Sequence, residues 1–257
     1  PNLTAWVSPV HLVVMRSRRR DQNGVAISES VSVPIAELGL KPKTLDKISR
    51  YLDVTRSALL FGNRAILVEG IAEALLLPVL AQQLILAGDA DGWLRFKGTV
   101  IVPIEGVDFR PYVEVLLRPH GDARIADRLI VITDADPTVL GNRKVDLENL
   151  AATHGAPQAL TVLTNQHTLE HEIFDAGNEV FLKSVFLRLH RNSRRDWTDR
   201  IEGAAVQDRP DAFLKLIEAK KTRKGDLAQA IASRIAAGEP FVVPLYLADA
   251  IRGAAQA

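Results

Sequence analysis

The fold of this chain is decided by one stretch of sequence, Ala65-Ile66-Leu67-Val68-Glu69-Gly70-Ile71-Ala72-Glu73. Four apolar residues lead into a glutamate and a glycine, and a second glutamate follows one helical turn later. This pattern is typical of a buried strand, a tight turn and a helix, because strands of parallel sheets are apolar along their length. Ligands bind at the carboxyl ends of such strands. We therefore expect Glu69 at the edge of a sheet, with Glu73 on the first turn of the next helix and close to it.

The residues after this stretch alternate between apolar strand patterns and helical patterns. Strands are expected at residues 99–104, 128–133 and 159–164, and helices at residues 72–87, 109–117 and 145–153. Because parallel strands need long crossover connections, this alternation predicts an α/β fold with a mostly parallel sheet flanked by helices.

Three regions are expected along the chain. The α/β domain should cover residues 41–175, since a helical pattern starts near residue 43 and the last strand pattern ends at residue 164. From residue 176 to residue 257 the apolar spacing is helical, which predicts an additional C-terminal helical domain. Residues 1–40 carry only short strand patterns, at residues 11–15 and 31–34, around a polar loop, and do not resemble the start of a protein.

Composition excludes several classes of site. The 257 residues include no cysteine, which excludes disulfide scaffolds, thiolate zinc sites and cysteine nucleophiles, and favours a cytoplasmic location. No apolar run approaches the roughly 20 residues of a membrane span, so no membrane contact is expected.

The net charge is only +1, but residues 176–257 hold 14 Lys and Arg against 10 Asp and Glu. A basic region beside acidic motifs would suit a polyanionic substrate.

Acidic residues recur at the ends of the expected strands. They are Glu69, Glu73, Asp134, Asp136 and Glu170. Several carboxylates at one sheet edge repel each other unless a proton or a cation neutralises them, and an oxygen-only ligand set favours Mg²⁺ or Mn²⁺ over zinc. The number of ligands is enough for two cations about 4 Å apart, the arrangement that cleaves phosphodiesters. Each acid taken alone has another interpretation, since Glu170 could cap a helix and the Asp134–Asp136 pair could form a turn.

These residues together resemble a known family. Leu67-Val68-Glu69-Gly70 with Glu73, followed by a strand that ends in Thr133-Asp134-Ala135-Asp136, is similar to the Toprim domain of topoisomerases, primases and nucleases. More narrowly, the chain resembles the C-terminal nuclease half of OLD (overcoming lysogenization defect) proteins over roughly residues 43–250. Further similar segments are Pro1–Leu3, Ile104–Phe109, Thr168–Glu170 and Lys224–Ala228.

The resemblance implies a DNA endonuclease or nickase that uses two divalent cations, Mg²⁺ or Mn²⁺. Glu69, Glu73, Asp134, Asp136 and Glu170 match the family's metal ligands, with Glu69 and Asp134 at the centre of the chemistry. Lys224 matches a lysine that assists phosphate chemistry, although it could also be an ordinary surface lysine. Residues 1–40 would then be the tail of an upstream ATPase domain and a linker. Because no G-x-x-x-x-G-K-[ST] loop is present, we expect no ATP hydrolysis by this chain.

Three other functions fit parts of the sequence. Asp134-Ala135-Asp136-Pro137-Thr138 also fits the D-x-D-x-T motif of haloacid-dehalogenase-type phosphohydrolases, with Asp134 as nucleophile, but this leaves Glu69 and Glu73 without a role. A topoisomerase would need a tyrosine in a separate DNA-gate domain. The third alternative is a non-enzymatic DNA-binding module in which the acids bind one structural cation.

Overall fold

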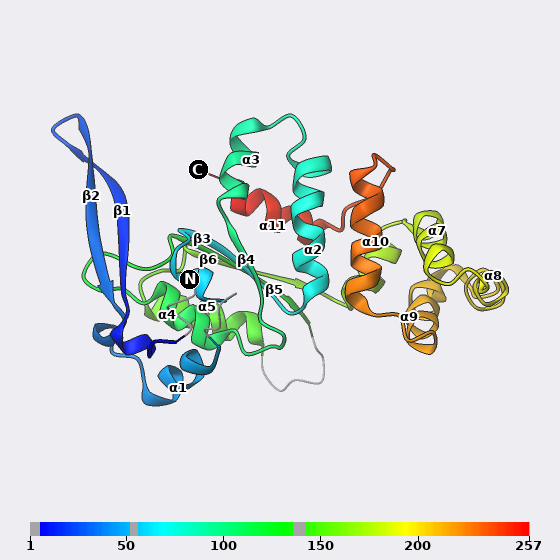
Figure 1. Cartoon of the computed structure of the whole chain (residues 1–257), viewed down its shortest axis with the longest axis horizontal. Helices are drawn as coiled ribbons and strands as arrows, with labels where there is room; N and C mark the ends of the chain where they lie inside the picture. Colours follow the sequence, from blue (N-terminus) through cyan, green and yellow to red (C-terminus); the bar gives the residue numbers. More distant parts are fainter. Residues whose placement is uncertain (1–5, 52–55, 136–141, 257) are drawn as a thin grey trace. The chain divides into compact units, whose positions relative to one another are not determined.

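The computed structural model describes residues 6–51, 56–135 and 142–256 (Figure 1). These residues divide into two compact units. Unit 1 comprises residues up to Leu67, Gly98–Val131 and the part of the chain up to Val162 that follows residue 141. Unit 2 comprises Val68–Lys97, residues 132–135 and Leu163 onward. The segment Pro1–Leu3 and residue Asp136, both used in the family resemblance, lie outside the described residues. The expected domain bounds at residues 40 and 175 remain predictions.

The expected α/β sheet is present. Its strands are β3 (Arg64–Val68), β4 (Val100–Pro103), β5 (Arg128–Asp134) and β6 (Leu160–Asn165), in the order β4-β3-β5-β6. The apolar stretch Ala65–Val68 is buried along its whole length, which explains why it forms a strand without polar alternation. β3 and β5 are parallel neighbours, with Leu67 opposite Val131, and this confirms the predicted parallel arrangement.

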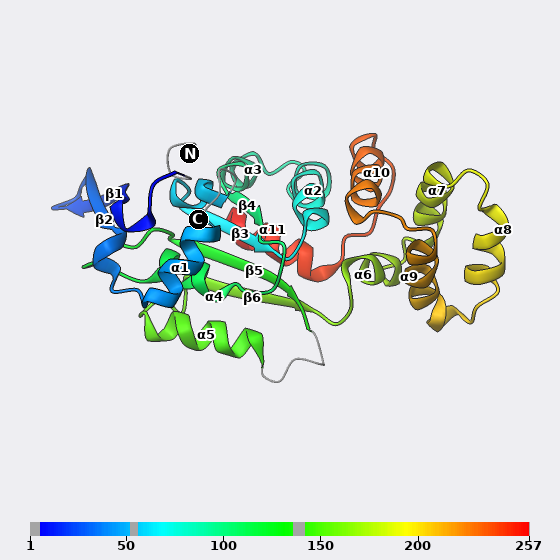
Figure 2. The ribbon, with the colours of Figure 1, turned by 60° about the horizontal axis from the view of Figure 1, so that its bottom comes forward.

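Helices follow the strands as predicted. The structure has α1 (Pro42–Tyr51), α2 (Ile71–Leu80), α4 (Arg110–Leu117), α5 (Arg143–Thr153) and α6 (Leu169–Asp175). In unit 1, α4 packs against α1 and α5, and both views show α4 and α5 side by side (Figures 1 and 2). The expected bounds of α4 (residues 109–117) and α5 (residues 145–153) are correct to within two residues.

The region after α2 differs from the prediction. The helix expected to run to residue 87 ends at Leu80 and continues as a π-helical turn, η5 (Ala81–Ile85), three residues after Pro78. A further helix, α3 (Ala90–Lys97), lies between the expected helix at residues 72–87 and the expected strand at residues 99–104, where no helix was predicted. Asp89 explains it, because its side chain accepts a hydrogen bond of 2.9 Å from the backbone N–H of Gly92 and so caps the helix start.

The N-terminal region also differs, since a polar loop was expected between two short strands. The strands β1 (Val13–Gln22) and β2 (Val25–Pro34) instead form one long antiparallel hairpin. Its turn is Asn23-Gly24, with φ of 57° and 80°. This residue pair favours the left-handed conformation that a two-residue hairpin turn requires, so the signal was available in the sequence. Short helices η2 (Pro9–His11), η3 (Ile35–Leu38) and η4 (Arg56–Leu60) complete unit 1.

The C-terminal part of unit 2 is helical, as predicted. It contains α7 (Glu179–Leu189), α8 (Arg194–Trp197), η6 (Thr198–Glu202), η7 (Val206–Asp208), α9 (Arg209–Ala219), α10 (Lys224–Ala236) and α11 (Leu245–Ala255). Trp197 is fully buried, with its ring 5.6–6.4 Å from the rings of Phe174, Phe186 and Phe213, so it joins four helical elements in one aromatic core. α11 was not predicted. Across the described residues, every helix is too short or too polar to cross a lipid bilayer.

Candidate functional site

The candidate site begins where β3 and β5 end, and all its described residues belong to unit 2. Glu69 follows the last residue of β3, and Asp134 is the last residue of β5. One carboxylate oxygen of Glu69 accepts hydrogen bonds from the Thr133 hydroxyl, at 2.5 Å, and from the Asp134 backbone N–H, at 2.9 Å. The two strand ends predicted to converge are therefore in direct contact.

The end of β6 contributes a residue that the sequence analysis missed. The Asn165 side-chain amide donates a hydrogen bond of 2.7 Å to a carboxylate oxygen of Asp134, and its backbone carbonyl accepts from Ala135. Asn165 is buried and is the last residue of its strand. A polar amide directly after an apolar strand was the available signal, because neighbouring parallel strands end at one edge. Thr133, which holds Glu69, was likewise missed as a site residue.

Glu73 lies on the first turn of α2, as predicted. Its pKa is raised from 4.5 to about 7, mainly by burial and also by the negative charges of Asp134 and Glu170. A hydrogen bond from its own backbone lowers the pKa and partly offsets these effects. Burial also raises the pKa of Asp134, with the charges of Glu69 and Glu170 adding to the effect, while the hydrogen bond from Asn165 lowers it. These mutual effects indicate that the four carboxylates form one electrostatic cluster.

Glu170 is the most buried acid of this cluster. It lies in the first turn of α6, its side chain is 4% exposed, and neither of its carboxylate oxygens accepts a hydrogen bond from a described residue. The cap position belongs to Thr168, so Glu170 does not cap the helix. Glu172 does stabilise the entry to α6, because it accepts the backbone N–H groups of Gln166 and His167 at 3.0 Å.

Lys224 is the cation that approaches this cluster. It is the first residue of α10, and its ammonium lies 3.4 Å from a carboxylate oxygen of Glu170, while two-thirds of its side chain is exposed. Its charge lowers the pKa values of Glu73 and Asp134, in opposition to the raising effects of burial and of the neighbouring acids. The structure therefore brings Lys224 to the acids although it is far from them in sequence.

Tyr246 lies beside the same acids. It is in the first turn of α11, is 9% exposed, and its hydroxyl makes no hydrogen bond within the described part of the chain. Burial raises the pKa of its phenol well above 10, and the charges of Glu73, Asp134, Glu172 and Glu170 raise it further. The sequence analysis did not assign Tyr246 to the site, because residues 176–257 were predicted to be helical without a separate helix at residues 245–255.

The donor set fits a divalent cation of the Mg²⁺ or Mn²⁺ type. All donors are carboxylate oxygens, and the buried oxygens of Glu170 have no hydrogen-bond donor among the described residues. In the arrangement of the described side chains, no three acids or histidines are close enough together to hold an ion. Binding would therefore require carboxylates to turn toward one another, and Asp136 would add a further ligand from outside the described residues.

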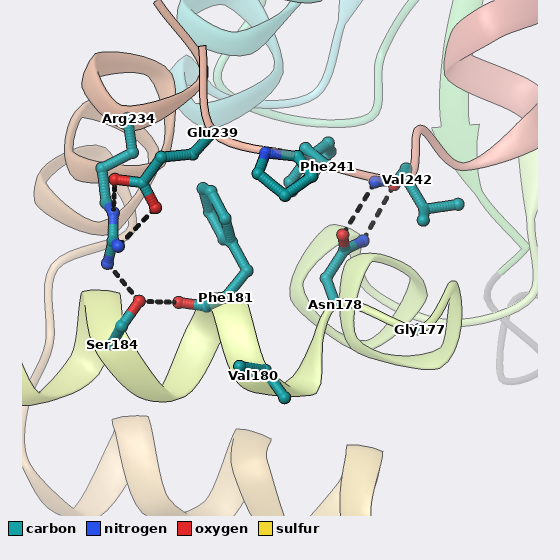
Figure 3. A pocket seen from close by; sticks show the side chains of 10 residues that line it. Gly177, Asn178, Val180, Phe181, Ser184, Arg234, Glu239, Phe241 and Val242 are labelled. Carbon is teal, nitrogen blue, oxygen red and sulfur yellow. Dashed lines mark hydrogen bonds and ion pairs between the residues drawn. The ribbon is translucent and has the colours of Figure 1, made fainter. Parts of the chain in front are cut away.

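A separate pocket of about 500 Å³ lies in unit 2 between α7, α10 and the segment that precedes α11 (Figure 3). Its charged groups satisfy each other, since Arg234 pairs with Glu239 and also bonds Ser184. Asn178 exchanges two hydrogen bonds of 2.8 Å with the backbone of Val242. None of the predicted site residues lines this pocket, so it is not part of the acidic cluster.

The sheet and the acids at its strand ends define a TOPRIM-type domain. Residues 60–136 match the family model for the TOPRIM domain of overcoming lysogenization defect protein-like proteins. Residues 60–136 are therefore an OLD-like TOPRIM domain, and the chain is similar to the C-terminal regions of OLD proteins. This match indicates a metal-dependent activity related to nucleic acids.

Solved structures agree with the family match. The C-terminal region of the OLD protein of Xanthomonas campestris pv. campestris is 25% identical with a TM-score of 0.54, and the alignment covers 76% of this chain and 95% of that one. The C-terminal region of the Burkholderia pseudomallei OLD protein is 26% identical with a TM-score of 0.51, covering 76% of this chain and 100% of that one. No curated protein sequence matches the chain.

Proposed function

We propose that this chain is the catalytic region of a DNA endonuclease or nickase that hydrolyses phosphodiesters with two divalent cations, Mg²⁺ or Mn²⁺. The observation that carries the proposal is the direct contact between Glu69 and the end of β5 at Asp134, with Glu73 and Glu170 in the same electrostatic cluster. Such a cluster of carboxylates is costly to maintain without positive charge, and the family match supports a nucleic-acid substrate.

The proposed ligands are Glu69, Glu73, Asp134, Asp136 and Glu170. When bound, divalent cations supply positive charge to the scissile phosphate and lower the pKa of water. Thr133 and the Asp134 backbone N–H fix the orientation of Glu69, and Asn165 fixes that of Asp134. These partners orient Glu69 and Asp134 before a cation binds, although the carboxylates must still turn toward one another to bind it.

Lys224 is proposed to act on the phosphate. Without a cation its ammonium pairs with Glu170 at 3.4 Å, so it provides the positive charge that this buried carboxylate requires. If Glu170 were paired with a bound cation instead, the Lys224 ammonium would be able to stabilise negative charge on the phosphate oxygens. The solved relatives are C-terminal regions, which supports the further proposal that this region works with an ATPase domain of the same polypeptide.

Supercoiled plasmid tests this function. We expect the wild-type protein to nick plasmid in Mg²⁺ or Mn²⁺ but not in EDTA, and the variants Glu69→Gln and Asp134→Asn to lose the activity by at least about 10²-fold. Asp175→Asn is the matched control, because Asp175 is an exposed acid on the same helix as Glu170. Intact plasmid together with hydrolysis of small phosphomonoesters would favour the phosphohydrolase with Asp134 as nucleophile. Intact plasmid with a cation-dependent rise in Tm alone would favour a structural cation site.

A further inference from the structure

Two basic segments of unit 2 meet at the surface next to Lys224. Residues 190–196 and 220–224 together contain seven Lys and Arg and only one acid, Asp196. We propose that Arg191, Arg194, Lys221 and Arg223 form a surface, here called the basic surface, that binds the phosphate backbone of duplex DNA beside the catalytic carboxylates. The inference rests on the function proposed above and names how its substrate is held.

Side-chain contacts join the two segments. His190 and Thr222 share a hydrogen bond of 2.8 Å, and Lys220 forms an ion pair of 2.6 Å with Asp196. α7 and α10 pack against each other, and both views show them adjacent (Figures 1 and 2). Arg191 directly follows His190, and Lys221 and Arg223 flank Thr222. The cations of both segments therefore belong to one continuous surface.

The charge of this surface is not compensated by the protein. The charge of the single acid of the two segments, Asp196, is already balanced by its ion pair with Lys220, whose hydrogen bond lowers the pKa of Asp196. Arg191, Arg194, Lys221 and Arg223 are exposed, and none of them forms an ion pair with a described residue. Neighbouring positive charges repel each other. A polyanion that contacts all of them relieves this repulsion and interacts favourably with each cation.

The turn between α9 and α10 brings this surface to the catalytic cluster. Lys221 adopts a φ of 52°, a left-handed conformation that is uncommon for lysine, and its backbone N–H bonds the Glu218 carbonyl to end α9. α10 then begins at Lys224, whose ammonium lies 3.4 Å from Glu170. DNA bound along the basic surface would thus have its backbone next to the acids.

The surface favours duplex DNA over single strands. Proteins that bind single strands stack bases on aromatic side chains, in addition to contacting phosphates. In the described residues of unit 2, every Phe, Tyr and Trp is buried or partly buried, so no stacking platform accompanies the cations. Contacts to phosphates alone give binding that is strong at low salt and independent of sequence.

The test measures binding separately from cleavage. The triple variant Arg191→Gln/Lys221→Asn/Arg223→Gln is compared with wild type by fluorescence anisotropy of a short labelled duplex in EDTA, over a KCl series. Asn suits the left-handed position of Lys221, so the turn should be kept. We expect the triple variant to bind at least about tenfold more weakly at low salt, with the salt slope reduced by about one for each contact removed. Lys97→Gln, which removes an exposed cation of α3, should change neither quantity.

Each outcome decides one claim. If the triple variant bound the duplex with wild-type affinity, the claim that the basic surface binds DNA would be refuted, even if plasmid nicking continued. A single strand that binds more tightly than the duplex, and that the substitutions weaken, would overturn the assignment to duplex DNA. Loss of duplex binding by the triple variant in a protein that never nicks plasmid would leave the basic surface standing and refute the proposed function. Hydrolysis of bis(p-nitrophenyl) phosphate should be unchanged, because this small diester does not reach the basic surface.

Discussion

Two side chains show how single residues determine the charge and geometry of the acidic cluster. Glu73 does so through its raised pKa, and Thr133 does so through its hydrogen bond to Glu69. Glu73 is buried beside Asp134 and Glu170, so its charged form is disfavoured. Thr133 is buried and donates to Glu69, so it holds that carboxylate at the strand end. Both effects can be measured by substitutions that keep the shape of the side chain.

Glu73 should make the metal-free protein less stable as the pH rises. Its pKa is raised in the folded state to about 7, against 4.5 when unfolded, so the folded state holds the proton more tightly. The resulting stabilisation is complete below pH 4.5 and is lost as the pH rises through about 7. In EDTA, urea denaturation should show wild type losing on the order of 2 kcal/mol more than Glu73→Gln over this range. Equal pH dependence of the two proteins would refute the raised pKa.

Thr133→Val should weaken cation binding with little effect on the fold. The substitution keeps the branched shape of the side chain but removes the hydroxyl that donates to Glu69. Loss of this hydrogen bond should lower the free energy of unfolding by about 1 kcal/mol. Loss of such a supporting hydrogen bond typically lowers metal affinity about 10-fold or more. Titration calorimetry with Mn²⁺ measures the affinity. Thr161→Val, at an exposed position of β6, is the control, and equal affinity for all three proteins would show that Thr133 does not position Glu69.

At the scale of elements, the helices of unit 2 are fixed by a few buried contacts outside the sheet. Trp197 joins α6, α7 and α9 through its aromatic neighbours, and α6 carries Glu170. Asn178, which precedes α7, holds the extended segment before α11 through the backbone of Val242 (Figure 3). α11 carries Tyr246, which lies beside the acidic cluster, so the hydrogen bonds of Asn178 help to position a residue next to the acids.

Asn178→Ala should destabilise the protein by about 2–3 kcal/mol, as measured by urea denaturation. The buried amide makes two hydrogen bonds with Val242 and one, of 2.8 Å, with the carbonyl of Ile173. Each is worth about 1 kcal/mol, and their loss leaves buried polar groups without partners. Asn192→Ala, at an exposed position between α7 and α8, should change stability by less than about 0.5 kcal/mol. If both variants were equally stable, Asn178 would not hold the segment before α11.

For the whole molecule, the spacing of apolar residues predicted the strands and helices that have buried faces. It did not predict the elements whose formation depends on a turn or a helix cap. The strand that ends at Glu69 and its parallel neighbour β5 followed from apolar runs. The β1–β2 hairpin and α3 were missed because their signals, Asn23-Gly24 and Asp89, are short. Acids at strand ends predicted the cluster. Asn165 was missed although a polar residue at a strand end was a signal for it, and Thr133 was missed because only the register of neighbouring strands brings its hydroxyl to Glu69.

The most direct test of the central claim is anomalous diffraction from crystals of this chain grown with Mn²⁺. We predict two anomalous peaks about 4 Å apart, bound by carboxylates from the set Glu69, Glu73, Asp134, Asp136 and Glu170. The peaks should disappear in crystals of Glu69→Gln/Asp134→Asn grown in the same way. Saturating Mn²⁺ with no peak at these carboxylates, or with peaks only elsewhere on the protein, would contradict the claim that the strand-end acids form the metal centre.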